Sequence, residues 1–231
     1  MNTSPKTLTV EECDILLADL LGRSKGGAGW RYALRTYTMA VLMLDAGLRV
    51  GELVRLELRD LFFQEKPVKT LIIRALIAKR KRERSVPMSV RAQYALRDYL
   101  SESPRLHAAD DTSYAFRVFL RDEHLTTRQV ERAIRSAAMK AIGRPVHPHI
   151  LRHTFASRLM RVTDSRTVQE LLGHKNLSST QVYTHPNEDD KKKAIERAND
   201  YPHGLHGFGD NSPRLSDVAN GINACRTNHD H

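Results

Sequence analysis

The first hydrophobic positions of the chain repeat at three- and four-residue intervals, as they do on one face of a helix. Four leucines within Leu16–Leu21 follow this spacing, and Thr9 precedes Glu12 by three residues. A Thr and a Glu so placed have the capping-box pattern that begins a helix. We therefore expect an amphipathic helix from residue 9, and after a glycine-rich basic loop a largely buried helix over residues 30–46, closed by Gly47.

After Asp60 the pattern changes from helical to extended. Short runs rich in β-branched and aromatic residues lie at 61–65, 70–77 and 84–89, and Lys66, Pro67 and a charge cluster interrupt them. Runs of this composition between turn-forming residues are typical of strands. We expect them to form one small antiparallel sheet.

Helical periodicity returns at Ser89 and continues to about residue 102, and a further helix is expected from Thr126, with Gln129 as its capping-box partner. Beyond Asn199 the sequence is polar and glycine-rich without periodicity. The expected fold class is α+β, mainly helical with a small antiparallel β-sheet. The expected organisation is one domain over residues 6–200 and a poorly ordered tail over residues 201–231.

The charge balance points to a polyanionic partner. Lys and Arg outnumber Asp and Glu by 37 to 27, which gives a formal net charge of +10, and nucleic acid is the leading candidate. The two cysteines, Cys13 and Cys225, have no zinc-ligand spacing, and the longest apolar stretch, residues 39–44, is far too short to span a membrane. We expect a cytoplasmic protein without membrane contact.

Residues 146–160, VHPHILRHTFASRLM, combine an imidazole and a guanidinium on one helical face. Pro148 is suited to the first turn of a helix, and His149, Arg152 and His153 then follow at helical spacing. Such a group can bind an anion. The alternative is a solvated helix face.

A second chemistry-bearing segment is VQELLGHKNLSSTQVYTH, residues 168–185. A short apolar helix ends at Gly173, His174 follows, and a Ser/Thr-rich stretch then begins a helix that carries Tyr183. The alternative for Tyr183 is a half-buried packing residue.

Arg49 begins a short helix that contains Glu52. A cation at a helix start is unfavourably placed relative to the helix dipole unless an anion lies there too, which suggests a bound phosphate. The alternative is a salt bridge from Arg49 to Glu52 or Asp60, and such a bridge does not exclude a phosphate role.

A basic turn, AKRKRERSVP, lies between two of the expected strands. With the net charge of the chain, contact with a DNA backbone is favoured over a merely solvated hairpin tip. Its candidate DNA-binding residues are Arg80, Lys81, Arg82 and Arg84.

The chain resembles the catalytic domain of the tyrosine recombinase, or phage integrase, family. The resemblance is carried, in this order, by GLRVGEL, AKRKRERSVP, HILRH, LLGH and a tyrosine nine positions after His174. The resemblance covers about residues 6–200 and implies the DNA breaking-rejoining fold of that family. Carried over position by position, it implies these catalytic residues, with the last as nucleophile: Arg49, Lys79, His149, Arg152, His174 and Tyr183. Because Ala78 and Arg80 stand where relatives carry glycines, Lys81 stays open as an alternative to Lys79.

The resemblance implies a site-specific recombinase that cleaves and rejoins double-stranded DNA through a 3′-phosphotyrosyl intermediate, without metal, ATP or any other cofactor. Integration, excision, inversion and plasmid-multimer resolution are all open. The alternatives are a type IB topoisomerase and a non-catalytic DNA-binding regulator on the same fold.

The resemblance also implies assembly. About eight residues precede the first expected helix, where most relatives carry a DNA-clamping domain. We therefore expect a catalytic domain alone, which works as a homo-oligomer, a tetramer on paired sites, or with an accessory DNA-binding protein. The segment of residues 188–199 is expected to dock on a neighbouring protomer.

Overall fold

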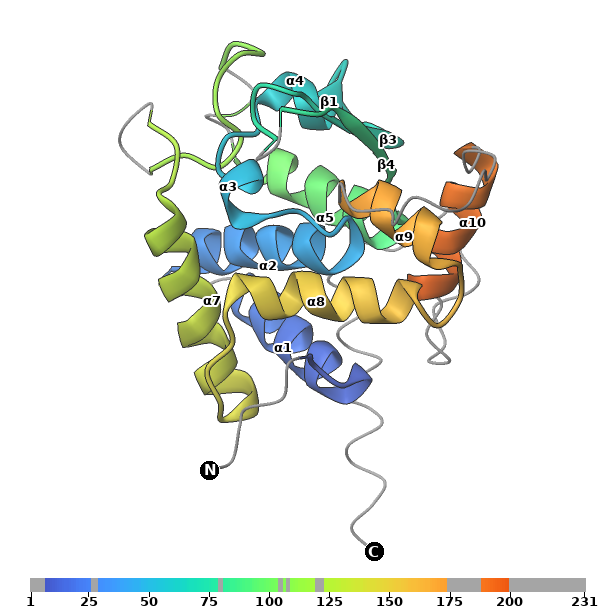
Figure 1. Ribbon diagram of the computed structural model, residues 1–231. Coiled ribbons are helices and arrows are strands. Elements are labelled where there is room, and N and C mark those ends of the chain that lie inside the picture. Colours follow the sequence, from blue (N-terminus) through green and yellow to red (C-terminus); the bar gives the residue numbers. More distant parts are fainter. Residues whose placement is uncertain are drawn as a thin grey trace, which may run out of the picture.

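The computed structural model describes residues 7–25, 29–78, 81–103, 106, 109–118, 123–173 and 188–199, without the side chains of residues 188–190. The described chain is mainly helical (Figure 1). Its helices are α1 (Val10–Arg23), α2 (Trp30–Asp45), α3 (Val50–Leu53), α4 (Leu58–Leu61), α5 (Val90–Ser101), α7 (Thr127–Ile142), α8 (Pro148–Leu159), α9 (Ser165–Leu172) and α10 (Glu188–Asn199). Its strands are β1 (Phe62–Phe63), β2 (Lys66–Pro67), β3 (Thr70–Ile73) and β4 (Arg84–Pro87).

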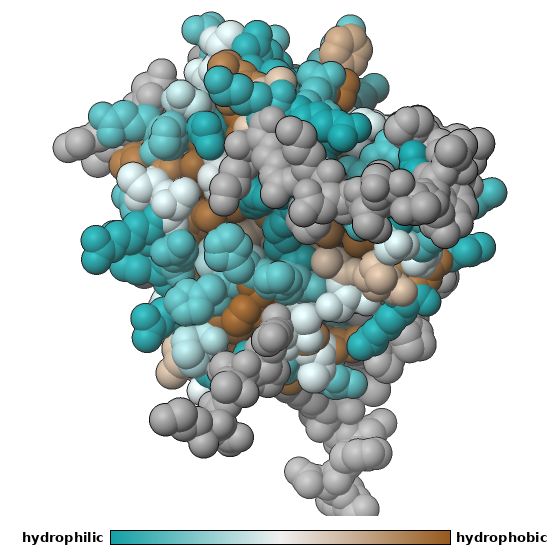
Figure 2. Space-filling view, viewed as in Figure 1, coloured by the Kyte–Doolittle hydropathy of each residue, from teal (hydrophilic) through white to brown (hydrophobic). Residues whose placement is uncertain are grey.

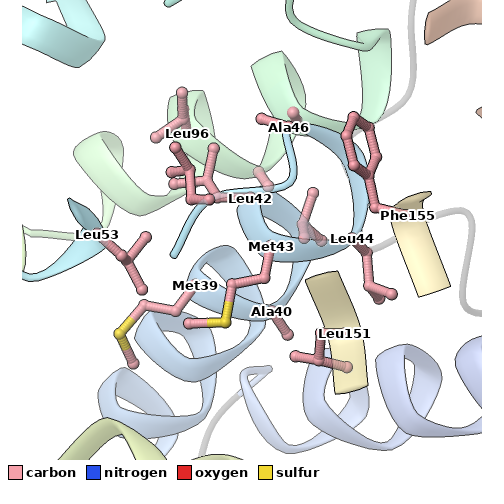
Figure 3. Close-up of a cluster of buried hydrophobic side chains, with 14 of the residues drawn as sticks. Met39, Ala40, Leu42, Met43, Leu44, Ala46, Leu53, Leu96, Leu151 and Phe155 are labelled. Carbon is pink, nitrogen blue, oxygen red and sulfur yellow. The ribbon is translucent and has the colours of Figure 1, made fainter. Parts of the chain in front are cut away.

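Helix α2 is the centre of the hydrophobic core. It packs against α1, α5, α7 and α8, and its apolar side chains from Met39 to Leu44 are fully buried. Figure 3 shows Leu96 of α5 and Leu151 and Phe155 of α8 around these residues. A helix that is apolar on all sides is stable only when neighbours cover every face. The core therefore brings together segments far apart in the sequence.

The expected helix boundaries are confirmed where local capping signals exist. The Thr9 hydroxyl accepts from the Glu12 amide at 3.1 Å, and the Glu12 carboxylate accepts from the Thr9 amide at 3.0 Å. Thr126 and Gln129 form the second capping box. Capping satisfies amide groups that the first helical turn leaves without partners.

The strands differ in part from the expectation. Within the described residues, β1 pairs with β2 and β3 pairs with β4, both antiparallel, as two separate two-stranded sheets. Lys66 and Pro67, expected as a break, form β2, because Gln64 and Glu65 adopt left-handed conformations that turn the chain back. The strand expected over residues 70–77 ends at Ile73.

Helix α10 packs against its own domain. Ala194, Ile195 and Ala198 are buried, α10 contacts α2, α8, α9 and β4, and the Lys191 ammonium lies 3.1 Å from the Glu170 carboxylate. Docking on a neighbouring protomer was expected for this segment. In the single chain of this structure α10 lies against α2, α8, α9 and β4, and its docking on a neighbouring protomer stays a prediction.

The face viewed in Figure 2 is mostly hydrophilic, with hydrophobic residues in small separate areas. No helix in the part of the chain that the structure describes combines the length and hydropathy needed to cross a membrane. The tail expected over residues 201–231 lies outside the described residues.

Candidate active site

The first component of the site is Arg49, the N-cap residue of α3. Gly47, with φ of +60°, ends the turn after α2, and α3 starts three residues later, at Val50. The Glu52 carboxylate accepts from the Arg49 amide at 2.9 Å and from Nη1 of the Arg49 side chain at 2.9 Å. The ion pair with Glu52 considered from the sequence is therefore present.

Glu52 is shared by a second arginine. Nη1 of Arg84 donates to Oε1 of Glu52 at 2.9 Å, and Nη2 donates to Oε2 at 2.7 Å. The two side chains are 5% and 1% exposed. Each carboxylate oxygen thus accepts from both Arg49 and Arg84, which is the satisfied geometry that a buried charge requires.

Arg152 reaches the same region from α8. It is 8% exposed, and its guanidinium donates to the carbonyl oxygen of Gly47 and, at 2.8 Å, to that of Leu172. Arg152 therefore joins the turn before Arg49 to the carboxyl end of α9, where the helix dipole favours a cation. These segments lie together in Figure 1.

The electrostatics of this cluster favour an additional anion. Burial lowers the pKa of Arg152 to about 9, and the charge of Arg49 acts in the same direction. Burial alone would raise the pKa of Glu52, but hydrogen bonds and charge from Arg84, and then Arg49, hold it at about 2. Three guanidinium groups therefore lie near one carboxylate that is ionised at neutral pH. A phosphate near Arg49 and Arg152 would relieve their repulsion.

His149 lies in the first turn of α8, three residues before Arg152, and its ring is exposed, as is that of His153. Pro148 is at the start of α8, as the sequence predicted. The imidazole of His149 and the guanidinium of Arg152 were expected to project from one face of this helix. The arginine of the pair is buried while the histidine faces solvent.

Lys81 and Arg82 are exposed on the turn before β4, in positions open to a large ligand. Arg84 is different. The sequence predicted it as a DNA-binding residue of an open basic turn. In the structure it starts β4 and is buried, and each of its guanidinium nitrogens donates to Glu52 or to the carbonyl oxygen of Leu171. The prediction of direct DNA contact by Arg84 is corrected, because a contact within the fold holds its side chain away from the surface.

The remaining predicted site residues lie outside the described residues. They are Lys79, Arg80, His174 and Tyr183. Gly173, which directly precedes His174, is described; it ends α9 with φ of +65°, as the sequence predicted.

Sequence reasoning missed two features of the site: Arg84 as a buried partner of Glu52, and the carbonyl groups of Gly47 and Leu172 as acceptors for Arg152. The signal for the first was the acidic residue three positions after Arg49, which needs more than one cation to be buried at low cost. The contacts with the carbonyl groups could not be predicted from the sequence, because every residue has a backbone carbonyl group.

The chain is similar to proteins of one known family. Residues 24–190 match the phage integrase family. The tyrosine recombinase XerD of Brucella suis biovar 1 is 35% identical over 197 residues, which are 83% of this chain and 62% of the relative. The chain thus spans less than two thirds of that relative.

Solved structures show the same fold. The crystal structure of XerA recombinase has a TM-score of 0.61 and 32% identity, over 84% of this chain and 65% of that one. The XerH site-specific recombinase, solved bound to difH substrate in a pre-cleavage complex, has a TM-score of 0.58 and 21% identity, over 74% of this chain and 48% of that one. Because the family match covers most of its length, the chain belongs to the phage integrase family.

Proposed function

We propose that this protein is a site-specific tyrosine recombinase that cleaves and rejoins double-stranded DNA. The observation that carries the proposal is the convergence of Arg49 and Arg152, from α3 and α8, on one carboxylate-anchored cluster with an excess of positive charge. A phosphodiester resists attack because it is anionic. Two planar cationic groups suit its two non-bridging oxygens as charge builds in the transition state.

In the proposed reaction the phenolic oxygen of Tyr183 attacks the scissile phosphorus. The bond from phosphorus to the 5′ oxygen breaks, and a 3′-phosphotyrosine and a free 5′ hydroxyl form. A free tyrosine has a pKa of about 10, so Tyr183 must lose its proton during the attack. His149, exposed at the start of α8, assists that loss as base or hydrogen-bond partner.

The departing 5′ oxygen needs a proton, and Lys79 of the basic turn is its proposed source, with Lys81 as the alternative. His174 donates a hydrogen bond to a phosphate oxygen. The ester to Tyr183 conserves the energy of the broken phosphodiester, so rejoining needs no nucleotide. These roles follow from the resemblance and from the residue chemistry.

The proposed partner is duplex DNA carrying specific recombination sites, and the proposed active form is a homo-tetramer on paired sites or a complex with an accessory DNA-binding protein. Exposed Lys81 and Arg82 and the net charge of +10 support backbone contact, which fixes the register of a protein on DNA. Cross-linking on DNA with one site and with two sites would measure the assembly.

The test is covalent trapping. Nicked duplexes covering the DNA that flanks the gene are incubated with wild-type protein, Tyr183→Phe and, as a matched control, Tyr32→Phe, which alters an exposed tyrosine of α2. Denaturing gels should show a protease-sensitive adduct with wild type and Tyr32→Phe alone.

Other outcomes of the trapping test have defined meanings. A DNA shift without any adduct would favour a non-catalytic DNA-binding regulator, and an adduct that survives Tyr183→Phe would show that another residue is the nucleophile. Relaxation of supercoiled plasmid without paired sites would favour a type IB topoisomerase.

A further inference from the structure

Arg84 contacts two segments that lead to predicted site residues, and it follows a third directly in the chain. Its two terminal nitrogens donate to Glu52, which also holds Arg49. Its Nε donates to the carbonyl oxygen of Leu171, at 3.0 Å, near the end of α9. It also follows the exposed basic turn of Lys81 and Arg82 by two residues.

The contact with α9 is close as well as polar. A Cβ atom on Gly173 would lie 3.1 Å from Cδ of Arg84, so the side chain of Arg84 occupies the space that the missing side chain leaves. Gly173 is the last described residue before His174. Arg84 therefore packs against the residue at which α9 ends.

The contact with Glu52 determines how Arg49 is held. Each oxygen of Glu52 accepts from both arginines: Oε1 from their Nη1 atoms at 2.9 Å, and Oε2 from the Arg49 amide at 2.9 Å and Nη2 of Arg84 at 2.7 Å. With Arg84 removed, the Glu52 carboxylate would keep only Arg49 from this set and could rotate about its side chain.

We infer that Arg84 is a positioning residue for the DNA cleavage reaction rather than a residue that contacts DNA. Arg84 positions Arg49 through Glu52 and connects the basic turn to the end of α9. The inference rests on the proposed function. Lysine cannot replace this residue, because one ammonium lacks the fork that meets both oxygens of Glu52 and the Leu171 carbonyl together.

The test measures Arg84→Lys on the nicked duplexes that trap wild type. At saturating protein, the single-turnover rate of adduct formation should fall on the order of 100-fold, as expected when a reacting group is slightly displaced. The dissociation constant for the same duplex should change less than about threefold, since the buried side chain offers no phosphate contact.

The matched control is Arg144→Lys. Arg144 also binds a glutamate through two nitrogens, with Nε at 2.6 Å and Nη2 at 2.7 Å from the oxygens of Glu12, but it joins α1 to the loop after α7. Thermal unfolding of every variant is followed, and rates are compared at a temperature where all are folded. Arg144→Lys should cleave at the wild-type rate.

A double-mutant cycle separates positioning from a merely structural role. If Arg84 acts through Arg49, the double variant should cleave less than about threefold more slowly than Arg49→Lys alone. If the two residues act independently, the rate reductions of the two single variants should multiply in the double variant. Should Arg84→Lys be unfolded, Glu52→Gln replaces it in the same cycle.

Three results would overturn the inference. Arg84→Lys could cleave as wild type does, its effect could multiply with that of Arg49→Lys, or it could weaken DNA binding and reduce the salt dependence by about one phosphate contact. Each of these results would still be consistent with the proposed function, provided that the wild-type protein forms the covalent adduct. Absence of an adduct from wild type and every variant would instead refute the proposed function.

Discussion

Gly47 lies directly against the ring of Phe155, and a Cβ atom at this position would overlap Cδ1 and Cε1 of that ring. Gly47 also has φ of +60°, and its carbonyl oxygen accepts from Arg152. One residue therefore couples the packing of α8 on the core to the placement of Arg152, an arginine of the proposed active site.

Gly47→Ala should lower the free energy of unfolding by about 2–4 kcal/mol, from left-handed strain and overpacking together. Gly143→Ala is the matched control, because Gly143 has φ of +70° but no atom within 4 Å of a built Cβ. It should cost only about 1 kcal/mol. Urea unfolding measures both, and equal losses would contradict the role given to Phe155.

Glu52 should make the stability depend on pH in acid. Its folded pKa of about 2 lies below the ordinary value of 4.5, so its contribution is present above pH 4.5 and is lost as pH falls toward 2. The contribution is on the order of 3 kcal/mol. The stability gap between wild type and Glu52→Gln should narrow from pH 5 to pH 3 in urea titrations, and a constant gap would disprove this account.

Lys81 and Arg82 should contribute to the salt dependence of DNA binding. Lys81→Gln and Arg82→Gln should each weaken binding and lower the slope of log K against log salt by about 1, the value for one phosphate contact. Glu83→Gln, at the neighbouring exposed position, should not lower the slope. Fluorescence anisotropy across a salt series measures the DNA binding of all three variants. An unchanged slope for Lys81→Gln or Arg82→Gln would show that the substituted residue does not contact the DNA backbone.

Ile195 should hold α10 on the domain. It is 1% exposed, and Ile195→Ala should destabilise this packing by about 2–4 kcal/mol, which would speed amide hydrogen exchange throughout α10. Lys192→Ala, at an exposed position of the same helix, should leave exchange unchanged. If the amide hydrogens of α10 exchanged at the wild-type rate in Ile195→Ala, the contacts of α10 with its own chain would contribute little to the stability of this helix.

The sequence allowed most of the helices to be predicted, and it singled out Arg49 and Arg152, which the structure brings near each other. The capping boxes at Thr9 and Thr126 and the ends at Gly47 and Gly173 depend on residues only a few positions away. The strand limits were less accurate, because the turn at Gln64 and Glu65 uses left-handed conformations that neither residue type signals strongly.

By itself, the sequence determined the helical periodicity, the basic character and the order of motifs that places this chain in its family. Only the tertiary structure decided that Arg84 is buried against Glu52 while Lys81 and Arg82 stay exposed, and that α10 lies on its own domain. The reason is physical: capping and periodicity act between near neighbours. The burial of a charge instead depends on a counter-charge 32 positions away, which only packing of the whole chain brings into contact.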